Sequence, residues 1–287
     1  MRTKRLTALL ACATALIVAG CSSVPIVSDQ DGPPSGRMGR LPPDAVPRPE
    51  PYSRYGNGPV YEVLGSRYTV LPTATGYQER GVASWYGQKF HGRLTSSREV
   101  YDMYEMTAAH KTLPLPTYVR VRNLSNGRSI VVRVNDRGPF VHNRIIDLSY
   151  AAALRLDMVK DGTGLVEVTA ITFDETSGDR PVREVTAAAP AAQQAPAEPV
   201  AEQPVRNVHG ERLFVQVGAF GERSNAERRL SLLSGRGIAN AFVHRDESGP
   251  NTIFRVRIGP VTEVAQYDVL VEQLESIGIS DPWLVAE

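Results

Sequence analysis

Proline is distributed unevenly along this chain of 287 residues, and its distribution limits where folded structure can form. Ten of the 21 prolines fall between Pro25 and Pro72, and five fall between Pro181 and Pro204. Proline fixes φ and has no backbone N–H, so dense runs exclude helix interiors and the interior of a sheet. Two folded units are therefore predicted, preceded and separated by extended tethers. A hydrophobic content of 42% is enough to bury a core and excludes disorder of the whole chain.

The first twenty residues are typical of a bacterial export signal. Positive charges at Arg2 to Arg5 precede the apolar run Leu6–Gly20, which is too short to span a bilayer. The following Cys21 resembles the lipidated cysteine of bacterial lipoproteins, and Ser22 after it implies the outer membrane, facing the periplasm. The alternative is a general secretory signal with an incidental cysteine. With Cys21 lipidated, the mature chain has no thiol for a disulfide or a metal site.

These features predict five regions. Residues 1–20 are the signal peptide, 21–76 a lipid-anchored proline-rich tether, 77–175 the first folded domain, 176–207 an Ala/Pro-rich linker and 208–287 the second folded domain. About fifty extended residues at about 3.1 Å each give the first tether a reach on the order of 150 Å.

The first folded domain is predicted to be mainly β. Asn126-Gly127 between two apolar runs indicates a tight hairpin, and Ser149 is expected to cap a short helix over 150–156. The predicted strands are Val82–Tyr86, Tyr118–Asn123, Ser129–Asn135 and Leu165–Thr172.

Several motifs in this domain together resemble one family. They are Gly81-Val-Ala-Ser-Trp-Tyr-Gly87, Phe90-His-Gly-Arg-Leu-Thr95, Val134-Asn-Asp-Arg-Gly-Pro139 and Arg144-Ile-Ile-Asp-Leu-Ser149. On these residues the domain resembles the rare lipoprotein A family of lytic transglycosylases. The resemblance implies a double-psi β-barrel that cleaves peptidoglycan between N-acetylmuramic acid and N-acetylglucosamine. It also implies 1,6-anhydro ends, because the sugar's own 6-hydroxyl attacks the anomeric carbon in place of water.

Such a reaction requires a carboxyl group that protonates the leaving oxygen and can take a proton from the 6-hydroxyl. Asp136 ends an apolar strand before a Gly-Pro turn, and we expect it to be this acid/base. The resemblance also implies functional roles for Glu99 and His110: Glu99 would stabilise positive charge on the sugar or help to position the sugar, and His110 would hold one carboxylate by a hydrogen bond. Arg98 departs from the family pattern, which usually has glycine before this glutamate.

Aromatic rings bind the C–H faces of sugars, so Tyr86 and Tyr101 are candidate substrate contacts. Asp147 is expected to cap the following helix, with a position in the glycan groove as the alternative. The histidines lack the spacing of a metal site, and we predict no metal and no cofactor.

The second folded domain alternates strand-helix-strand twice in fewer than eighty residues, which predicts a small ferredoxin-like α/β sandwich. Its runs Phe214–Phe220 and Phe254–Pro260 resemble the SPOR family, which implies binding to denuded, peptide-free glycan strands. Strict alternation puts Phe214, Gln216, Gly218 and Phe220 on the glycan-binding face and Val215, Val217 and Ala219 under the helices. Arg255 and Arg257 on the returning strand are further candidate binding residues.

Three functions are left open by the sequence. The first is an endolytic transglycosylase delivered to the division septum, with septal division proteins as candidate partners. The others are a non-catalytic wall-binding scaffold and an ordinary hydrolase that leaves reducing ends. Nucleic acid is excluded as a partner because the net charge is only +1 and the chain carries an export signal.

Overall fold

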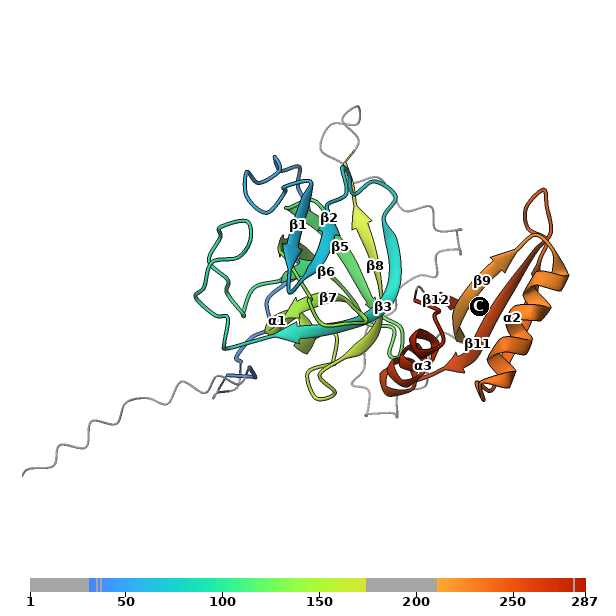
Figure 1. The fold of residues 1–287 in the computed structure, drawn as a ribbon. Coiled ribbons are helices and arrows are strands. Elements are labelled where there is room, and N and C mark those ends of the chain that lie inside the picture. Colours follow the sequence, from blue (N-terminus) through green and yellow to red (C-terminus); the bar gives the residue numbers. More distant parts are fainter. Residues whose placement is uncertain (1–30, 35, 37, 174–210, 281) are drawn as a thin grey trace, which may run out of the picture.

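A computed structural model describes residues 31–34, 36, 38–173, 211–280 and 282–287. It contains two folded units and a small hairpin (Figure 1). The predicted signal peptide, Cys21 and the linker 176–207 lie outside the described residues. Among the described helices, none is both long enough and apolar enough to cross a membrane.

The first unit is a closed barrel of six strands in the order β3-β7-β4-β6-β5-β8, as the resemblance implied. Two of the strand pairs in the barrel are parallel, β3 with β7 and β4 with β6. The strands are β3 (Gln78–Tyr86), β4 (Thr107–His110), β5 (Thr117–Asn123), β6 (Ser129–Asp136), β7 (Arg144–Ser149) and β8 (Gly164–Ile171).

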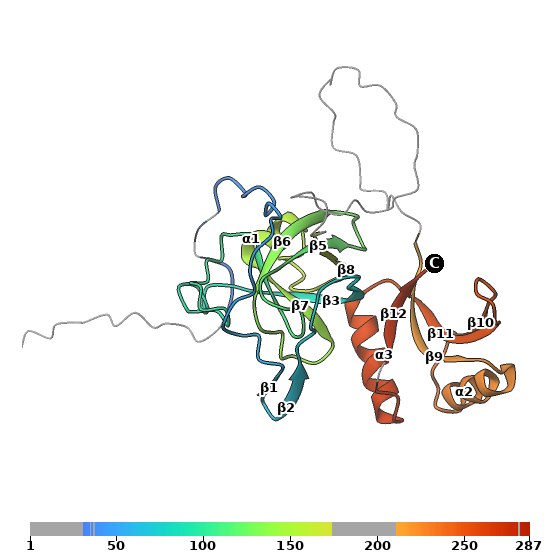
Figure 2. The same cartoon turned by 90° about the horizontal axis from the view of Figure 1, so that it is seen from above.

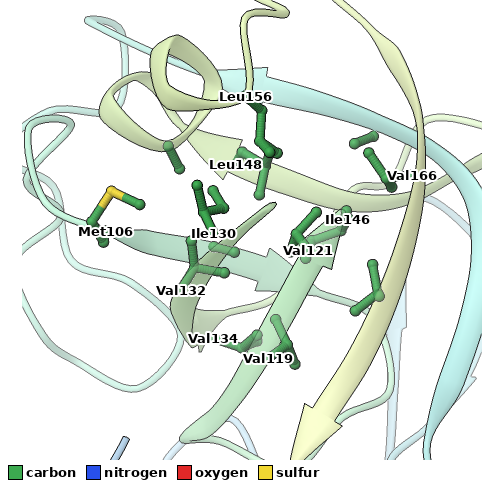
Figure 3. Close-up of a cluster of buried hydrophobic side chains, with 14 of the residues drawn as sticks. Met106, Val119, Val121, Ile130, Val132, Val134, Ile146, Leu148, Leu156 and Val166 are labelled. Carbon is green, nitrogen blue, oxygen red and sulfur yellow. The ribbon is translucent and has the colours of Figure 1, made fainter. Parts of the chain in front are cut away.

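Alternating apolar residues build the core of the barrel. Ile130, Val132 and Val134 of β6 point inward and are almost fully buried, as Figure 3 shows. The predicted hairpin joins β5 and β6, and Gly127 has the positive φ that its turn requires. Ser149 caps α1 (Tyr150–Arg155) by accepting a hydrogen bond from the Ala152 N–H, which confirms the predicted cap. The expectation that Asp147 caps this helix is therefore wrong.

The proline-rich segment differs from the prediction. Residues 38–58 form neither helix nor strand, as their prolines require, but they run along the barrel surface and make main-chain hydrogen bonds to it. Ala45 donates to Val131 O at 3.0 Å, and Arg155 donates to Pro42 O at 2.7 Å. A hairpin of β1 (Val60–Val63) and β2 (Ser66–Thr69) follows. The expectation of a free tether is therefore wrong for this part of the segment, because its polar groups find partners on the barrel.

The second unit is a four-stranded antiparallel sheet in the order β10-β11-β9-β12, the arrangement of a ferredoxin-like sandwich (Figure 2). Two helices pack on one face of this sheet through Leu233 and Leu274. The elements are β9 (Leu213–Phe220), α2 (Arg223–Gly235), β10 (Ala241–Asp246), β11 (Ile253–Val261), α3 (Val264–Ser276) and β12 (Trp283–Ala286).

Candidate active site

A β-bulge orients Asp136 at the end of β6. Ala108 pairs with Val134, but the next residue of β4, Ala109, pairs with Asp136, so Asn135 is an extra residue without a partner. Strict alternation after Val134 would send Asp136 into the core. The bulge instead turns it to the outer face beside Ala109, and re-aiming a side chain in this way is a recurring use of bulges next to active sites.

Three hydrogen bonds hold the carboxyl group of Asp136. The backbone N–H and the hydroxyl of Ser96 donate to Oδ1 at 2.8 and 2.6 Å, and the backbone N–H of Arg137 donates to it at 2.7 Å. In the described part of the chain these bonds all end on Oδ1. Oδ2 is therefore the oxygen that can serve a substrate.

Glu99 lies on the same loop as Ser96, and its side chain contacts β6. Arg133 binds its carboxylate through both terminal nitrogens at 2.7 and 3.0 Å, and Asn135 Nδ2 donates at 2.8 Å. Partial burial opposes ionisation of Glu99, but the hydrogen bonds from Arg133 and Asn135 outweigh it and lower its pKa. Glu99 is therefore a carboxylate at neutral pH, which suits stabilisation of positive charge and not proton donation.

The departure at Arg98 has a structural explanation. Arg98 has φ of +70°, in the left-handed region where glycine carries no steric cost, which accounts for the glycine usual at this position. Its guanidinium lies over the ring of Tyr55, 5.5 Å from the centroid, whereas Glu99 is paired with Arg133. The arginine thus changes how the loop packs and leaves the carboxylate's own partners in place.

His110 has a different role from the expected one. Its ring is buried, and Nδ1 accepts hydrogen bonds from the backbone N–H groups of Thr112 and Leu113 at 3.1 and 3.0 Å. Nε2, which then carries the proton, donates to the Tyr77 hydroxyl at 2.7 Å. Burial, assisted by the charges of Arg137 and Lys111, lowers the pKa of His110 to about 3.

The expectation that His110 holds a catalytic carboxylate is therefore wrong. Its ring fixes the turn after β4, and among the described residues its hydrogen bonds lead to the carboxylate of Glu79, through the Tyr77 hydroxyl. The main chain of His110 contributes separately, because its carbonyl accepts a hydrogen bond from Arg137 Nη1 at 3.1 Å. A neutral, buried imidazole with both nitrogens in use is a structural element of the site.

Tyr86 and Tyr101 do not offer free ring faces to a sugar. Their rings stack on each other with centroids 4.2 Å apart, and the Tyr101 hydroxyl donates to Tyr86 O at 2.7 Å. The Tyr86 hydroxyl is buried beside the Thr107 hydroxyl. Burial, then the neighbouring Tyr101, Asp136 and Asp147, raise its pKa against the opposing effect of Thr107, so this hydroxyl stays protonated.

Asp147, for which the sequence favoured a helix cap, lies beside Asp136 in this site. It pairs with Ala109 from the side opposite Asp136, so the two carboxyl groups flank one small residue. The Ser84 hydroxyl donates to it, and burial raises the pKa of Asp147. A charged residue inside the apolar run Ile145–Leu148 was the signal that could have identified it.

The second unit also contains a bulge that changes an expectation. Val256 pairs with Gly218, whereas Arg257 pairs with Gln216, so Val217 is an extra residue on β9. Gly218 and Phe220 consequently turn toward the helices, and Ala219 is exposed on the open face. The expected face is correct for Phe214 and Gln216. It is wrong for the residues after the bulge, because the alternation of residue types in a sequence does not reveal one inserted residue.

The candidate glycan-binding residues form a polar network on this open face. Gln216 is 1% exposed and accepts a hydrogen bond from Arg257 Nε at 3.2 Å, while Arg257 also pairs with Glu287. Arg255 pairs with Asp246 at 2.7 Å, and the buried Phe214 packs edge-on against Phe242. Trp283, aligned with Gln216 on β12, is 49% exposed and offers the open aromatic surface. Within the described residues no group of three or more His, Cys, Asp or Glu could hold a metal ion.

Comparison with known proteins identifies both units. Residues 78–169 match the family model described as lytic transglycolase, and residues 210–286 match the SPOR domain model. A Vibrio cholerae protein named endolytic peptidoglycan transglycosylase RlpA is 40% identical, over 94% of this chain and 93% of its own length. A Pseudomonas aeruginosa protein of the same name is 40% identical, over 85% of this chain and 80% of its own length. The crystal structure of the SPOR domain of RlpA from Pseudomonas aeruginosa is 29% identical, with 25% of this chain and 96% of that chain covered and a TM-score of 0.24.

Proposed function

Since this chain belongs to the RlpA family of endolytic peptidoglycan transglycosylases, we propose that its barrel cuts glycan strands with Asp136 as acid/base and Glu99 as the charge-stabilising carboxylate. The observation that carries this proposal is the bulge at Asn135. It brings Asp136 to the outer face of the barrel, next to the loop that carries Glu99.

The proposed reaction uses no water. Asp136 Oδ2 donates its proton to the glycosidic oxygen as the bond from the anomeric carbon of N-acetylmuramic acid breaks. The 6-hydroxyl of the same sugar then bonds to the anomeric carbon, and its proton returns to Asp136. Ionised Glu99 offsets the positive charge on the sugar during this exchange.

Product analysis distinguishes the candidate functions. Purified full-length protein in detergent is incubated with glycan strands stripped of their peptides, and the fragments are analysed by mass spectrometry. We expect 1,6-anhydro ends, which are one water lighter than reducing ends. Reducing ends would support a hydrolase, and intact strands would support a wall-binding scaffold.

We further propose that the SPOR domain directs the protein to denuded strands at the division septum. The exposed ring of Trp283 lies beside the Gln216–Arg257 network, an arrangement of aromatic surface and polar groups that suits a sugar chain. Phe214 and Gln216 are buried, so they support this face and contribute little to its exposed surface.

Replacing Trp283 with alanine in the full chain is expected to weaken binding to denuded cell wall about tenfold, because an exposed aromatic anchor is lost. Val269, an exposed apolar residue on helix α3, provides the matched control. Co-sedimentation with peptide-free and peptide-rich wall measures both variants. Equal loss in Val269→Ala, or no loss in Trp283→Ala, contradicts the assignment of the open face.

We also propose that Cys21 carries lipid and anchors the protein in the outer membrane, facing the periplasm. The charge-then-apolar leader before Cys21 and Ser22 after it support this proposal. Cys21→Ala is expected to move the protein from the membrane fraction to the soluble periplasm and to abolish labelling with palmitate. Continued labelling of the variant would refute the anchor.

A further inference from the structure

The segment 50–57, part of the proline-rich stretch, lies against the loop that carries the proposed catalytic groups. Ser53 Oγ donates to Ser97 O at 3.4 Å, and Tyr55 lies under the guanidinium of Arg98. Gly56 approaches so closely that a Cβ there would lie 3.0 Å from Ser96 O. A positive φ of +76° gives this glycine a second reason to lack a side chain. The segment therefore packs along the whole of loop 96–98.

One side chain of this segment reaches the site through Arg133. Glu50 binds Arg133 Nε at 3.2 Å and Nη2 at 2.8 Å, while Glu99 takes Nη1 at 2.7 Å and shares Nη2 at 3.0 Å. One guanidinium thus bridges two carboxylates that are 49 positions apart (99 − 50) in the sequence. The Tyr118 hydroxyl donates to Glu50 from the far side and fixes the Glu50 carboxylate in turn.

This arrangement restrains the plane of the guanidinium. Arginine has five N–H donors in a rigid fork, so a carboxylate on the Nε edge also sets the direction of the Nη1 edge. Both Glu50 and Arg133 are largely buried, with side chains 17% and 19% exposed. Without Glu50, Arg133 regains rotamer freedom that it loses in the bridge, and Glu99 loses a fixed partner.

We propose that Glu50 is a positioning residue of the transglycosylase, which holds Glu99 in its working orientation through the guanidinium of Arg133. The inference rests on the proposed function of the barrel and extends its working site to a segment outside the six strands. It assigns residues 50–57 to the catalytic module and not to the tether.

The test compares two variants of the full-length protein in detergent, each lacking one ion pair between the proline-rich residues 38–58 and the barrel domain. Glu50→Gln keeps the shape of the side chain and removes its charge. Asp44→Asn removes a similar pair, Asp44 with Arg155 at 2.7 Å, which joins the earlier part of the proline-rich stretch to α1. Release of anhydro ends from denuded strands gives kcat and KM for each. We expect kcat of Glu50→Gln to fall about tenfold or more with KM within twofold, because misplaced groups slow the reaction more than they weaken binding. Asp44→Asn is expected to keep the kcat of the parent protein.

The outcomes separate this inference from the proposed function. If the parent protein releases no anhydro ends, the proposed function fails. If the parent is active and Glu50→Gln has the parent kcat, the positioning role is wrong and the proposed function stands. An equal loss in Asp44→Asn, or a rise in KM without a fall in kcat, shows that the segment only supports the fold or binds substrate. Should Glu50→Gln not fold, Tyr118→Phe decides: it removes one hydrogen bond to Glu50, and an unchanged kcat overturns the proposal.

Discussion

Asparagine in place of Asp136 is expected to lower the rate of anhydro-end release by a factor of about 10³ or more, because a general acid typically contributes 10²–10⁴. The amide matches the carboxyl group in size, and its oxygen can still accept the hydrogen bonds from Ser96 and Arg137. It cannot give a proton to the glycosidic oxygen or take one from the 6-hydroxyl. The loss is therefore expected in kcat, with binding of denuded strands retained.

Asp147→Asn is the matched comparison for this prediction, because Asp147 flanks Ala109 from the other side and its pKa is raised by burial. A carboxyl group with a raised pKa has one property of a general acid. If Asp136→Asn retains full cleavage and Asp147→Asn loses it, the acid/base is Asp147 and our assignment is wrong. Loss in both variants, with the larger fall for Asp136→Asn, supports the assignment.

His110 predicts a large dependence of stability on pH. Its pKa falls from 6.5 in the unfolded chain to about 3 in the folded one. Between these values the unfolded state binds a proton that the folded state does not, so stability is lost as pH falls through this window. The free energy of unfolding of the barrel is expected to drop by on the order of 3 kcal/mol between pH 7 and pH 4, at about 1.4 kcal/mol per pH unit below 6.5.

Urea unfolding at a series of pH values measures this effect, with the fluorescence of Trp85 as the probe of the barrel. Every protein compared also carries Trp283→Phe, which removes the second of the two tryptophans. The control is His110→Gln, because an amide oxygen can accept from the Thr112 and Leu113 N–H groups and does not titrate. The two proteins are compared by the slope of their free energy of unfolding against pH. The difference between the slopes separates the contribution of His110 from that of acidic groups such as Glu50, whose stabilising ionisation is also lost in acid. Equal slopes would show that His110 is not the titrating group.

Elements with strong alternation could be predicted from the sequence, and those with weak alternation could not. Strands β5, β6 and β8 are rich in valine and isoleucine, and the hairpin between the first two has an Asn-Gly turn. Strand β4 is Thr-Ala-Ala-His, which has little β propensity, and it forms because β6 and β7 pair with it on either side. Such strands depend on tertiary context that a single sequence does not display.

The direction in which side chains point was harder to predict than the strands themselves. One extra residue, Asn135 in β6 or Val217 in β9, reverses the face of every residue beyond it. Asp136 was identified by its position before a Gly-Pro turn and by family resemblance, and neither indicates its orientation. The bridge from Glu50 to Arg133 joins residues 83 positions apart, so no local pattern predicts it.

The docking of the proline-rich segment onto the barrel changes the distance at which this enzyme can work. If lipid holds Cys21 in the outer membrane, a main-chain hydrogen bond to the barrel domain already forms at Gly32, whose carbonyl accepts from the Gln88 N–H, 11 residues later (32 − 21). A fully extended chain of that length spans at most about 40 Å. The barrel then stays within about a quarter of the distance from the membrane that a free tether of fifty residues allows. Only glycan strands within that distance of the anchoring membrane can then reach the barrel, so the membrane must come close to the wall wherever this protein cuts.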